Sequence, residues 1–276
     1  MKMDHRGRAG KRWRTIVALV ATLLLLVAIA GYLRWPTRAA EGTALLGSMT
    51  RPAPTASIRI GTFNIDGGVG LNGVRDLSRT AGYIRDCDLV GLNEVHGRTL
   101  FTQQNQAEIL GRSVGLPWLF APVERQWWHD AFGNAVLTSL PVTHWQRLPL
   151  AGDSASSNRN VLLLSIKIGS QPVNVLISHV ERGHDHESQL RAVLGLFQLL
   201  APPAILLGDM NTTQIEPQMK QILAIPGVVD AIGQTIPTVA PHVDWILLRG
   251  LHTTQGKMQP KGVSDHPFFQ ADIAVD

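Results

Sequence analysis

Residues 161–180 read VLLLSIKIGSQPVNVLISHV, two apolar runs separated by a short polar segment. Both runs are rich in β-branched residues, and Gly169-Ser170-Gln171-Pro172 between them is a turn-forming sequence. The stretch therefore predicts an antiparallel hairpin. Parallel neighbours would need a crossover helix between them, so the hairpin indicates a mixed sheet rather than a purely doubly wound one.

The rest of the chain from residue 57 alternates short β-rich runs with helical patterns. Helices are expected over 74–85, 99–114 and 187–200, where apolar residues recur at helical spacing in the last range. NAVLTSLPV, residues 134–142, runs on towards WQRLPL without an intervening helix and is expected to be one strand. Further strands are expected at SIRIGTFNI, DLVGLNEV, AILLGDM, VDWILL and FFQADIAV. This pattern predicts a mixed α/β layered sandwich over residues 57–276.

The N-terminal segment has the composition of a membrane anchor. Residues 1–14 contain six basic side chains and one acid, and residues 15–33, TIVALVATLLLLVAIAGYL, contain no charge. Nineteen helical residues span about 28 Å, close to the hydrocarbon thickness of a bilayer. We therefore expect a cytoplasmic tail at 1–14, a transmembrane signal-anchor at 15–33, and the remainder outside the cytoplasm in a single-pass protein of the cell (inner) membrane.

A cleaved signal peptide is the alternative interpretation, because Ala28-Ile29-Ala30 has the small-x-small form of a cleavage site. The protein would then be secreted. Residues 34–56 are rich in Pro, Ala, Gly and Thr without periodicity, so we expect a flexible linker with an end-to-end distance of about 25 Å.

Charge is unevenly distributed along the chain. Residues 1–56 hold nine Lys/Arg and two Asp/Glu, whereas residues 57–276 hold sixteen Lys/Arg and nineteen Asp/Glu, a net charge of −3. The body therefore lacks the broad basic surface of a tight, non-specific nucleic-acid binder. The single cysteine, Cys87, excludes an internal disulfide and is expected to be a small buried residue.

Polar residues gather where the apolar strands begin or end, which is where loops converge into sites in layered α/β proteins. Carboxylates and amides without cysteine suit Mg²⁺ or Mn²⁺ rather than structural zinc. A histidine next to an acid can carry a proton, and a second histidine can stabilise charge on a phosphoryl oxygen. Together they predict a metal-assisted phosphoester hydrolase. The residues are Asn64, Asp66, Glu94, His179, Asp209, Asn211, Asp244, Asp265 and His266.

These segments resemble the endonuclease/exonuclease/phosphatase superfamily, which includes DNase I-like nucleases, neutral sphingomyelinases and inositol phosphatases. The matching pieces run in the family's order over residues 58–276: TFNIDG, LVGLNEV, GNAVLTSLPV, ISHV, LLGDMN, VDWIL and SDHPF. GDMN and SDHP in that order are the more specific part. The resemblance implies two mixed, largely antiparallel sheets packed together with helices outside.

The resemblance also implies roles at the metal. Glu94 matches the metal-binding glutamate, with Asn64 and Asp66 alongside, and Asp265 matches a residue near the metal in some members. The expected cofactor is Mg²⁺ or Mn²⁺. One departure is Asn93, which stands where the family usually has Gln.

Five further residues match the family's catalytic positions. Asp209 and Asn211 match the pair that positions the attacking water and the phosphate, and His179 matches the histidine that contacts the phosphate. His266 matches the acid/base histidine, and Asp244 the aspartate that orients it.

Two residues are candidates for substrate binding. Arg159 resembles an arginine common at its strand start. Trp128 lies in the aromatic-rich stretch WLFAPVERQWWHD, which core packing explains in part, and is expected at a substrate rim or at lipid headgroups.

The expected function is thus a membrane-tethered, divalent-metal-dependent phosphodiester hydrolase with an extracytoplasmic catalytic domain. Its substrate is a lipid headgroup, a small phosphodiester or nucleic acid, and no protein partner is expected. The alternatives are an extracellular or periplasmic nuclease of the same family and a non-catalytic binding domain.

Overall fold

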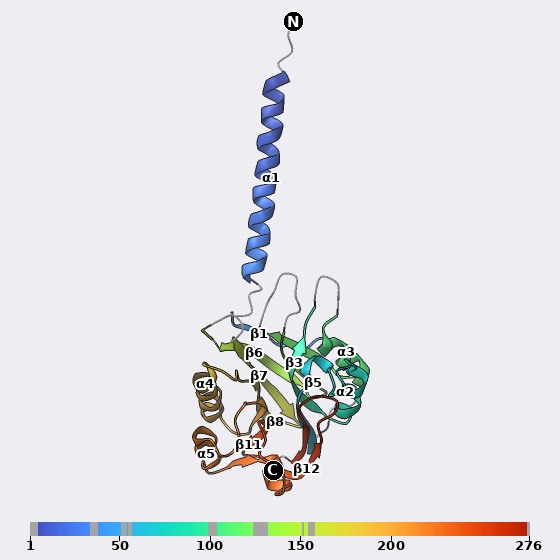
Figure 1. Ribbon diagram of the computed structural model, residues 1–276, viewed down its shortest axis with the longest axis vertical. Coiled ribbons are helices and arrows are strands. Elements are labelled where there is room, and N and C mark those ends of the chain that lie inside the picture. Colours follow the sequence, from blue (N-terminus) through green and yellow to red (C-terminus); the bar gives the residue numbers. More distant parts are fainter. Residues whose placement is uncertain are drawn as a thin grey trace.

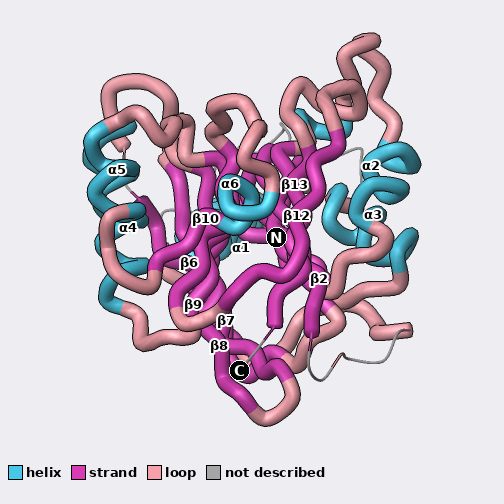
Figure 2. Tube along the Cα trace, turned by 90° about the horizontal axis from the view of Figure 1, so that it is seen from below, coloured by secondary structure: helices cyan, strands magenta, loops and turns pink. Residues whose placement is uncertain are grey.

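The computed structural model describes residues 5–33, 38–50, 54, 57–98, 104–123, 132–150, 152–153 and 158–274. Two β-sheets pack face to face, and helices cover their outer faces (Figures 1 and 2). The predicted layered sandwich of two mixed, largely antiparallel sheets is confirmed.

The first sheet has seven strands in the order β1-β6-β7-β8-β9-β11-β10. The hairpin of the opening stretch forms its centre, and β8 pairs with β9 in parallel. The strands are β1 (Ala40–Gly42), β6 (Val142–Leu150), β7 (Arg159–Ile168), β8 (Gln171–His179), β9 (Ala204–Asp209), β10 (Val228–Asp230) and β11 (Asp244–Arg249).

The second sheet has six strands in the order β12-β13-β2-β3-β5-β4. Here β2 and β3 form the parallel pair, and the other described pairs are antiparallel. The strands are β2 (Ser57–Asn64), β3 (Leu89–His96), β4 (Trp118–Pro122), β5 (Phe132–Thr138), β12 (His252–Gln259) and β13 (Phe268–Ala274).

Helices begin where side chains satisfy their free backbone N–H groups. Asp76 accepts from the Ser78 N–H at 2.9 Å, so α2 begins at residue 77 rather than at 74. Asn105 caps α3 in the same way, and residues 99–103 of the expected helix lie outside the described residues. The helices are α1 (His5–Leu33), α2 (Leu77–Ile84), α3 (Gln106–Val114), α4 (His186–Leu199), α5 (Pro217–Leu223), α6 (Ala231–Thr235) and the 3-10 helix η1 (Asp66–Gly68).

The main core fills the space between the two sheets and positions the site. Gly91 of β3 lies so close to β8 and β9 that a Cβ there would stand 3.2 Å from Ile177 and Leu207. The two parallel pairs, β2–β3 of one sheet and β8–β9 of the other, therefore pack against each other at the centre of the sandwich. Their carboxyl ends emerge at the same edge, where the predicted site residues stand. Helices α2 and α3 cover the outside of one sheet, and α4 and α5 cover the outside of the other (Figure 2).

Two strand predictions need correction. NAVLTSLPV is not one strand: β5 ends at Thr138 and β6 begins at Val142, and the two lie in different sheets. Its three middle residues carry the chain from one layer to the other. The hairpin turn is also shorter than expected. Gly169 and Ser170 alone connect β7 and β8, and the left-handed φ of 58° at Gly169 suits glycine.

The N-terminal helix is longer than its apolar stretch. Helix α1 is continuous from residue 5 and so includes most of the expected tail. Lys11–Ile29 is long and apolar enough to cross a membrane and has no contact with the sandwich (Figure 1). A signal sequence would meet the same description.

The described part of the expected linker is docked on the sandwich rather than free. Residues 40–42 form β1 at the edge of the first sheet, paired with β6. Leu46 and Trp118 exchange two backbone hydrogen bonds of 2.9 and 2.8 Å. Trp145 Nε1 donates to the Ala44 carbonyl at 3.0 Å. A fully flexible tether over 34–56 is therefore wrong for residues 38–50. We call this docked segment the strap.

Candidate active site

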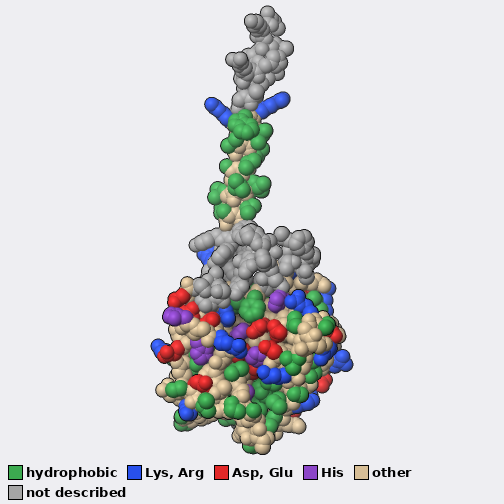
Figure 3. All heavy atoms as spheres, viewed as in Figure 1, with side chains coloured by type: hydrophobic (Ala, Val, Ile, Leu, Met, Phe, Trp, Pro, Cys, Tyr) green, Lys and Arg blue, Asp and Glu red, His purple; other side chains and the backbone are tan. Residues whose placement is uncertain are grey.

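The polar strand ends converge on one face of the molecule. Acidic and histidine side chains gather near the centre of that face in Figure 3. They come from both sheets, and hydrogen bonds link them: Asn64 of β2 donates through Nδ2 to Glu94 Oε1 at 2.9 Å and to Asp209 Oδ2 at 3.1 Å. The amide of Asn64 therefore bridges a carboxylate of each sheet. Its own oxygen accepts the Asp66 N–H at 3.2 Å, so Asn64 serves here as a hydrogen-bonding link, and the oxygen keeps a second lone pair that a cation could use.

The histidine that opens the last strand is held by a buried aspartate. His266 Nδ1 lies 2.7 Å from Asp244 Oδ2, and both residues are buried. Burial alone would lower the pKa of His266, but the hydrogen bond to Asp244 and the charges of Asp244, Asp209 and Asp265 raise it to about 9. The imidazole is thus a cation at neutral pH, with its Nε2 edge 3.8 Å from Asp209. The Ser264 hydroxyl fixes the loop, because it accepts the His266 N–H and donates to the Asn64 carbonyl at 2.7 Å.

The second histidine, unlike His266, is uncharged at neutral pH. His179, at the end of β8, is 5% exposed, and its Nε2 lies 3.6 Å from Asp209 Oδ2 and 3.9 Å from Glu94 Oε1. Burial dominates and lowers the pKa of His179 to about 4, although the Asp209 charge opposes this. At neutral pH the site therefore combines a neutral imidazole and an imidazolium on two sides of the same carboxylate.

Asn211 links the second histidine to the loop after β8. Its Nδ2 donates to the Val180 carbonyl at 2.8 Å and lies 3.3 Å from His179 Nε2. Arg182 Nε donates to Asn211 Oδ1 at 3.0 Å, which brings a guanidinium to the rim of the site.

Four carboxyl groups of the site have raised pKa values. Burial is the largest cause for Asp66, Glu94, Asp209 and Asp244, and neighbouring carboxylates raise each pKa further. Asp244 Oδ1 is also buried with no hydrogen-bond partner among the described residues. This crowding of negative charge is what a divalent cation would relieve, and oxygen donors are the ligands that Mg²⁺ and Mn²⁺ prefer.

Two groups of side chains in the site could supply ligands for that cation. Asp209, Asp244 and His266 offer ligand atoms within 4.8 Å of one another. However, the 2.7 Å hydrogen bond occupies His266 Nδ1 and one Asp244 oxygen, which is the arrangement of a proton-carrying pair. Glu94 is only half-buried, and the charge of Asp66 raises its pKa. The charge of the exposed Asp265 raises the pKa of Asp66 in turn. Glu94, Asp66 and Asp265 are more exposed to solvent, but their ligand atoms do not all lie within 4.8 Å of one another in this structure.

Backbone strain is concentrated at the same place. Among the described residues, the non-glycine residues with positive φ are Asp66 at 46°, Glu94 at 55° and Asn211 at 47°. A left-handed conformation costs about 1–2 kcal/mol for a residue such as Glu94 and less for Asp66 and Asn211, whose short polar side chains tolerate it. At Glu94 it accompanies an irregularity in the β3–β5 pairing between Leu92 and Val95. The strain turns each side chain out of its strand or loop and into the site.

A buried amide network supports the site from below. Asn93 Oδ1 accepts the Asp209 N–H at 3.0 Å, and its Nδ2 donates to Asn134 Oδ1 at 2.7 Å and to the Ser178 carbonyl at 3.2 Å. Asn134 Nδ2 donates onward to Asn160 Oδ1 at 3.0 Å. The shorter amide at 93 thus fits a polar connection between the two sheets directly beneath Asp209.

The remaining predicted residues lie at the edge of the site or outside the described chain. Arg159 begins β7, stacks over the Phe132 ring at 5.9 Å and acts electrostatically on His179. Trp128 lies outside the described residues. Arg182, Ser264 and Lys261 were not predicted. Arg182 is three residues beyond His179 at a strand end, a position that the strand-end pattern could have indicated.

Comparisons with known proteins identify the family and the shared fold. The model of the endonuclease/exonuclease/phosphatase family matches residues 61–266. An endonuclease/exonuclease/phosphatase from Beutenbergia cavernae DSM 12333 is 20% identical, with a TM-score of 0.61 over 80% of this chain and 72% of its own. A family protein from Leptotrichia buccalis C-1013-b is 18% identical, with a TM-score of 0.63 over 78% of this chain and 99% of its own. A D. rerio TDP2 humanised by 14 mutations is 17% identical, with a TM-score of 0.59 over 79% and 99%. At these identities the solved structures show the shared fold, and no curated protein matches the chain.

Proposed function

Because the chain belongs to the endonuclease/exonuclease/phosphatase family, we propose that it is a divalent-metal-dependent phosphodiester hydrolase. The observation that carries the proposal is the position of Asp209. Its Oδ2 lies 3.6 Å from His179 Nε2 and 3.8 Å from His266 Nε2, and it accepts a hydrogen bond from Asn64. One buried carboxylate is thus shared between a neutral and a charged imidazole, in a site where several carboxylates are crowded together.

Glu94, with Asp66 and Asp265, would hold the cation, which we propose to be Mg²⁺ or Mn²⁺. When bound there, the ion would polarise a phosphoryl oxygen and offset charge on the leaving oxygen. Asn64 would hold Glu94 and Asp209 in register through its two donated hydrogen bonds.

His179 and Asn211 would bind the phosphate. A neutral imidazole and an amide can both donate to phosphoryl oxygens, and Asn211 Nδ2 and His179 Nε2 lie 3.3 Å apart, which suits two contacts to one phosphate group. Arg159 adds positive charge on the His179 side.

Asp209 and His266 would act on the same phosphate group, because Asp209 Oδ2 and His266 Nε2 lie 3.8 Å apart. Asp209, whose burial raises its pKa, is suited to accept the proton of the attacking water. The water oxygen bonds to phosphorus, the opposite phosphorus–oxygen bond breaks, and the leaving oxygen takes a proton from solvent. His266, kept cationic by Asp244, donates to the phosphoryl oxygen on which charge increases.

Residues 57–276 form the catalytic domain in this proposal, and α1 would hold it at a membrane with the domain outside the cytoplasm. The apolar helix and the basic residues before it support the placement. Cleavage of the segment would instead give a secreted enzyme. The net charge of −3 over 57–276 favours a lipid headgroup or small phosphodiester over nucleic acid.

Hydrolysis of bis(p-nitrophenyl) phosphate by the full chain in detergent, with Mg²⁺, Mn²⁺ or EDTA, tests the proposal. Asp209→Asn and His266→Gln should each lower kcat by at least about 100-fold, whereas Asp86→Asn, which is exposed, and His144→Gln, which is half-buried on β6, should not. Metal-independent turnover, or full activity in Asp209→Asn, would refute the mechanism. Absence of turnover in a folded, metal-loaded protein with lipid, nucleotide and p-nitrophenyl substrates would support a binding domain.

A further inference from the structure

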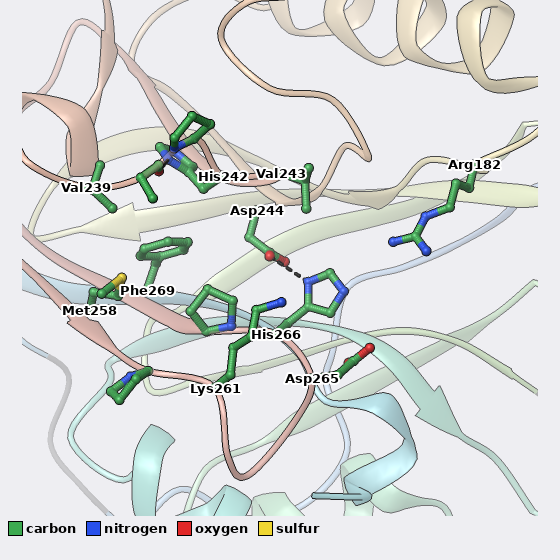
Figure 4. Close-up of a pocket in the computed structure, with 14 residues that line it drawn as sticks. Arg182, Val239, His242, Val243, Asp244, Met258, Lys261, Asp265, His266 and Phe269 are labelled. Atoms are coloured by element: carbon green, nitrogen blue, oxygen red, sulfur yellow. Dashed lines mark hydrogen bonds and ion pairs between the residues drawn. The ribbon is translucent and has the colours of Figure 1, made fainter. Parts of the chain in front are cut away.

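An open pocket of about 440 Å³ adjoins the His266–Asp244 pair. Its walls come from the segment before β11, the end of β12 and the loop that carries His266 (Figure 4). Because Asp244 and His266 belong to its wall, the pocket opens directly onto the groups that the proposed hydrolysis uses. The volume lies within the range of small-molecule sites.

One end of this pocket is largely apolar, and the buried His242 is the polar side chain there. Val239, Met258 and Phe269 lie together on one side of the Asp244–His266 pair, away from Arg182 and Asp265 on the other (Figure 4). Pro241 and Pro260 add to the same lining. Phe269 is 1% exposed and rigid, with its ring centre 5.1 Å from that of His242.

Met258 differs from the other apolar side chains, because it is 42% exposed on β12. Apolar surface that faces water in a concave site gains free energy when an apolar group covers it. A flexible thioether can also adapt to groups of different shape.

The end nearest the site carries Lys261 and Arg182 beside the carboxylates Asp244 and Asp265. Figure 4 shows the Lys261 side chain reaching towards His266, and its charge acts on Asp244. Arg182 stands at the other side of the pair, held by Asn211. They are the Lys and Arg side chains among the fourteen residues that line the pocket, which also include the His266 imidazolium. An anionic group at the site would thus have a cation on each side and an apolar chamber beside it.

We propose that this pocket binds an apolar substituent of the phosphoester while Lys261 and Arg182 face the anionic group of that phosphoester. This inference rests on the proposed hydrolase function. The substrate class is a single phosphoester that carries an alkyl or acyl-type group close to phosphorus. A polynucleotide is held mainly through many phosphates by many Lys and Arg, which this lining does not supply.

Alkylphosphonates test the pocket without depending on turnover, because each has one phosphate-like head and one tail that is not hydrolysed. Binding of inorganic phosphate and of methyl-, ethyl-, propyl- and butylphosphonate to the full chain in detergent with Mn²⁺ is measured by titration calorimetry. Each methylene that enters the pocket should tighten binding about fourfold, or about 60-fold from methyl to butyl.

Met258→Glu should flatten this gradient, and the matched Leu199→Glu, which changes an exposed apolar residue on α4, should keep it. Lys261→Gln should weaken all members alike by about two- to fivefold, whereas Lys257→Gln on the same segment of chain should not.

Equal affinity for methyl- and butylphosphonate would overturn the pocket proposal, and so would a gradient that Met258→Glu leaves unchanged. Phosphate and methylphosphonate report the head-binding site alone. Their failure to bind would count against the proposed hydrolase function, and the two failures are therefore distinguishable.

Discussion

Replacing Asp244 by asparagine should remove a pH dependence of stability that the His266–Asp244 pair creates in the metal-free protein. The pKa of His266 is raised from 6.5 to about 9. Each pKa unit corresponds to 1.36 kcal/mol, so the folded state's preference for the charged imidazole is worth about 3 kcal/mol. Because the folded pKa lies above the unfolded one, this stabilisation is complete below pH 6.5 and is lost as the pH rises through about 9.

The assay is thermal unfolding of the full chain in detergent and EDTA, followed by tryptophan fluorescence at several pH values across that window. For a domain of this size 1 kcal/mol shifts Tm by about 2–4 °C, so the wild-type Tm should fall by about 6–12 °C between the ends of the window. In Asp244→Asn, His266 keeps its burial but loses its main carboxylate partner. Its pKa should fall, and the decline should disappear.

Asp272→Asn is the matched control. It breaks the 2.7 Å ion pair with Arg59 near the C-terminal end of β13, the opposite end of that strand from His266, and should lower Tm at every pH without altering the slope. A wild-type Tm that is level across the window would refute the reasoning. A decline of equal size in Asp244→Asn would also refute it, because the slope would then come from other groups.

Three further changes follow from the same structure. The wild type should lose stability as the pH falls from 6.5 towards about 4, because the lowered pKa keeps the folded His179 imidazole neutral while the unfolded one is protonated. His179→Gln should remove this loss, and an unchanged Tm profile between these pH values would contradict the prediction. Glu94→Gly should be about 1 kcal/mol more stable than Glu94→Ala, since glycine accepts the φ of 55° without strain, and equal Tm values for the two variants would show that the residue is unstrained. Both variants should lose the Tm increase that Mn²⁺ gives the wild type. Asn93→Ala should cost about 3 kcal/mol or more in urea unfolding because three buried partners lose their hydrogen bonds, whereas the exposed Asn72→Ala should cost far less; similar losses would remove the case for the network.

The sheet strands that carry the site were predictable because local pattern and tertiary role agree in them. β2, β3, β8, β9 and β11 are short apolar runs that end or begin with a polar residue, and their burial on both faces makes the pattern clear. The family's order of segments then indicated the two-sheet sandwich. β12 was missed because HTTQGKMQ is an exposed, polar edge strand that resembles a loop in sequence.

Other features depend on packing that no local pattern carries. Residues 134–142 look like one strand, since Ser139-Leu140-Pro141 continues the apolar run, and only the partners of each half show the change of sheet. β1 has three residues and exists because β6 has a free edge there.

The site shows the same division. The types of its acids and histidines indicated the chemistry, but the left-handed φ of Glu94 and the approach of Lys261 to Asp244 arise from how loops distant in sequence meet.

If α1 is a membrane anchor, the strap limits how far the sandwich can travel from it. Between the end of α1 at Leu33 and the start of the strap at Arg38 the chain makes five peptide steps, which reach at most about 18 Å when fully extended. If α1 stays in the bilayer, the domain moves in two dimensions with its host membrane and meets only molecules that come to that surface. A cut after Ala30 would release the same domain with the strap still paired to β6, so one fold would serve either as a surface-bound or as a diffusing enzyme.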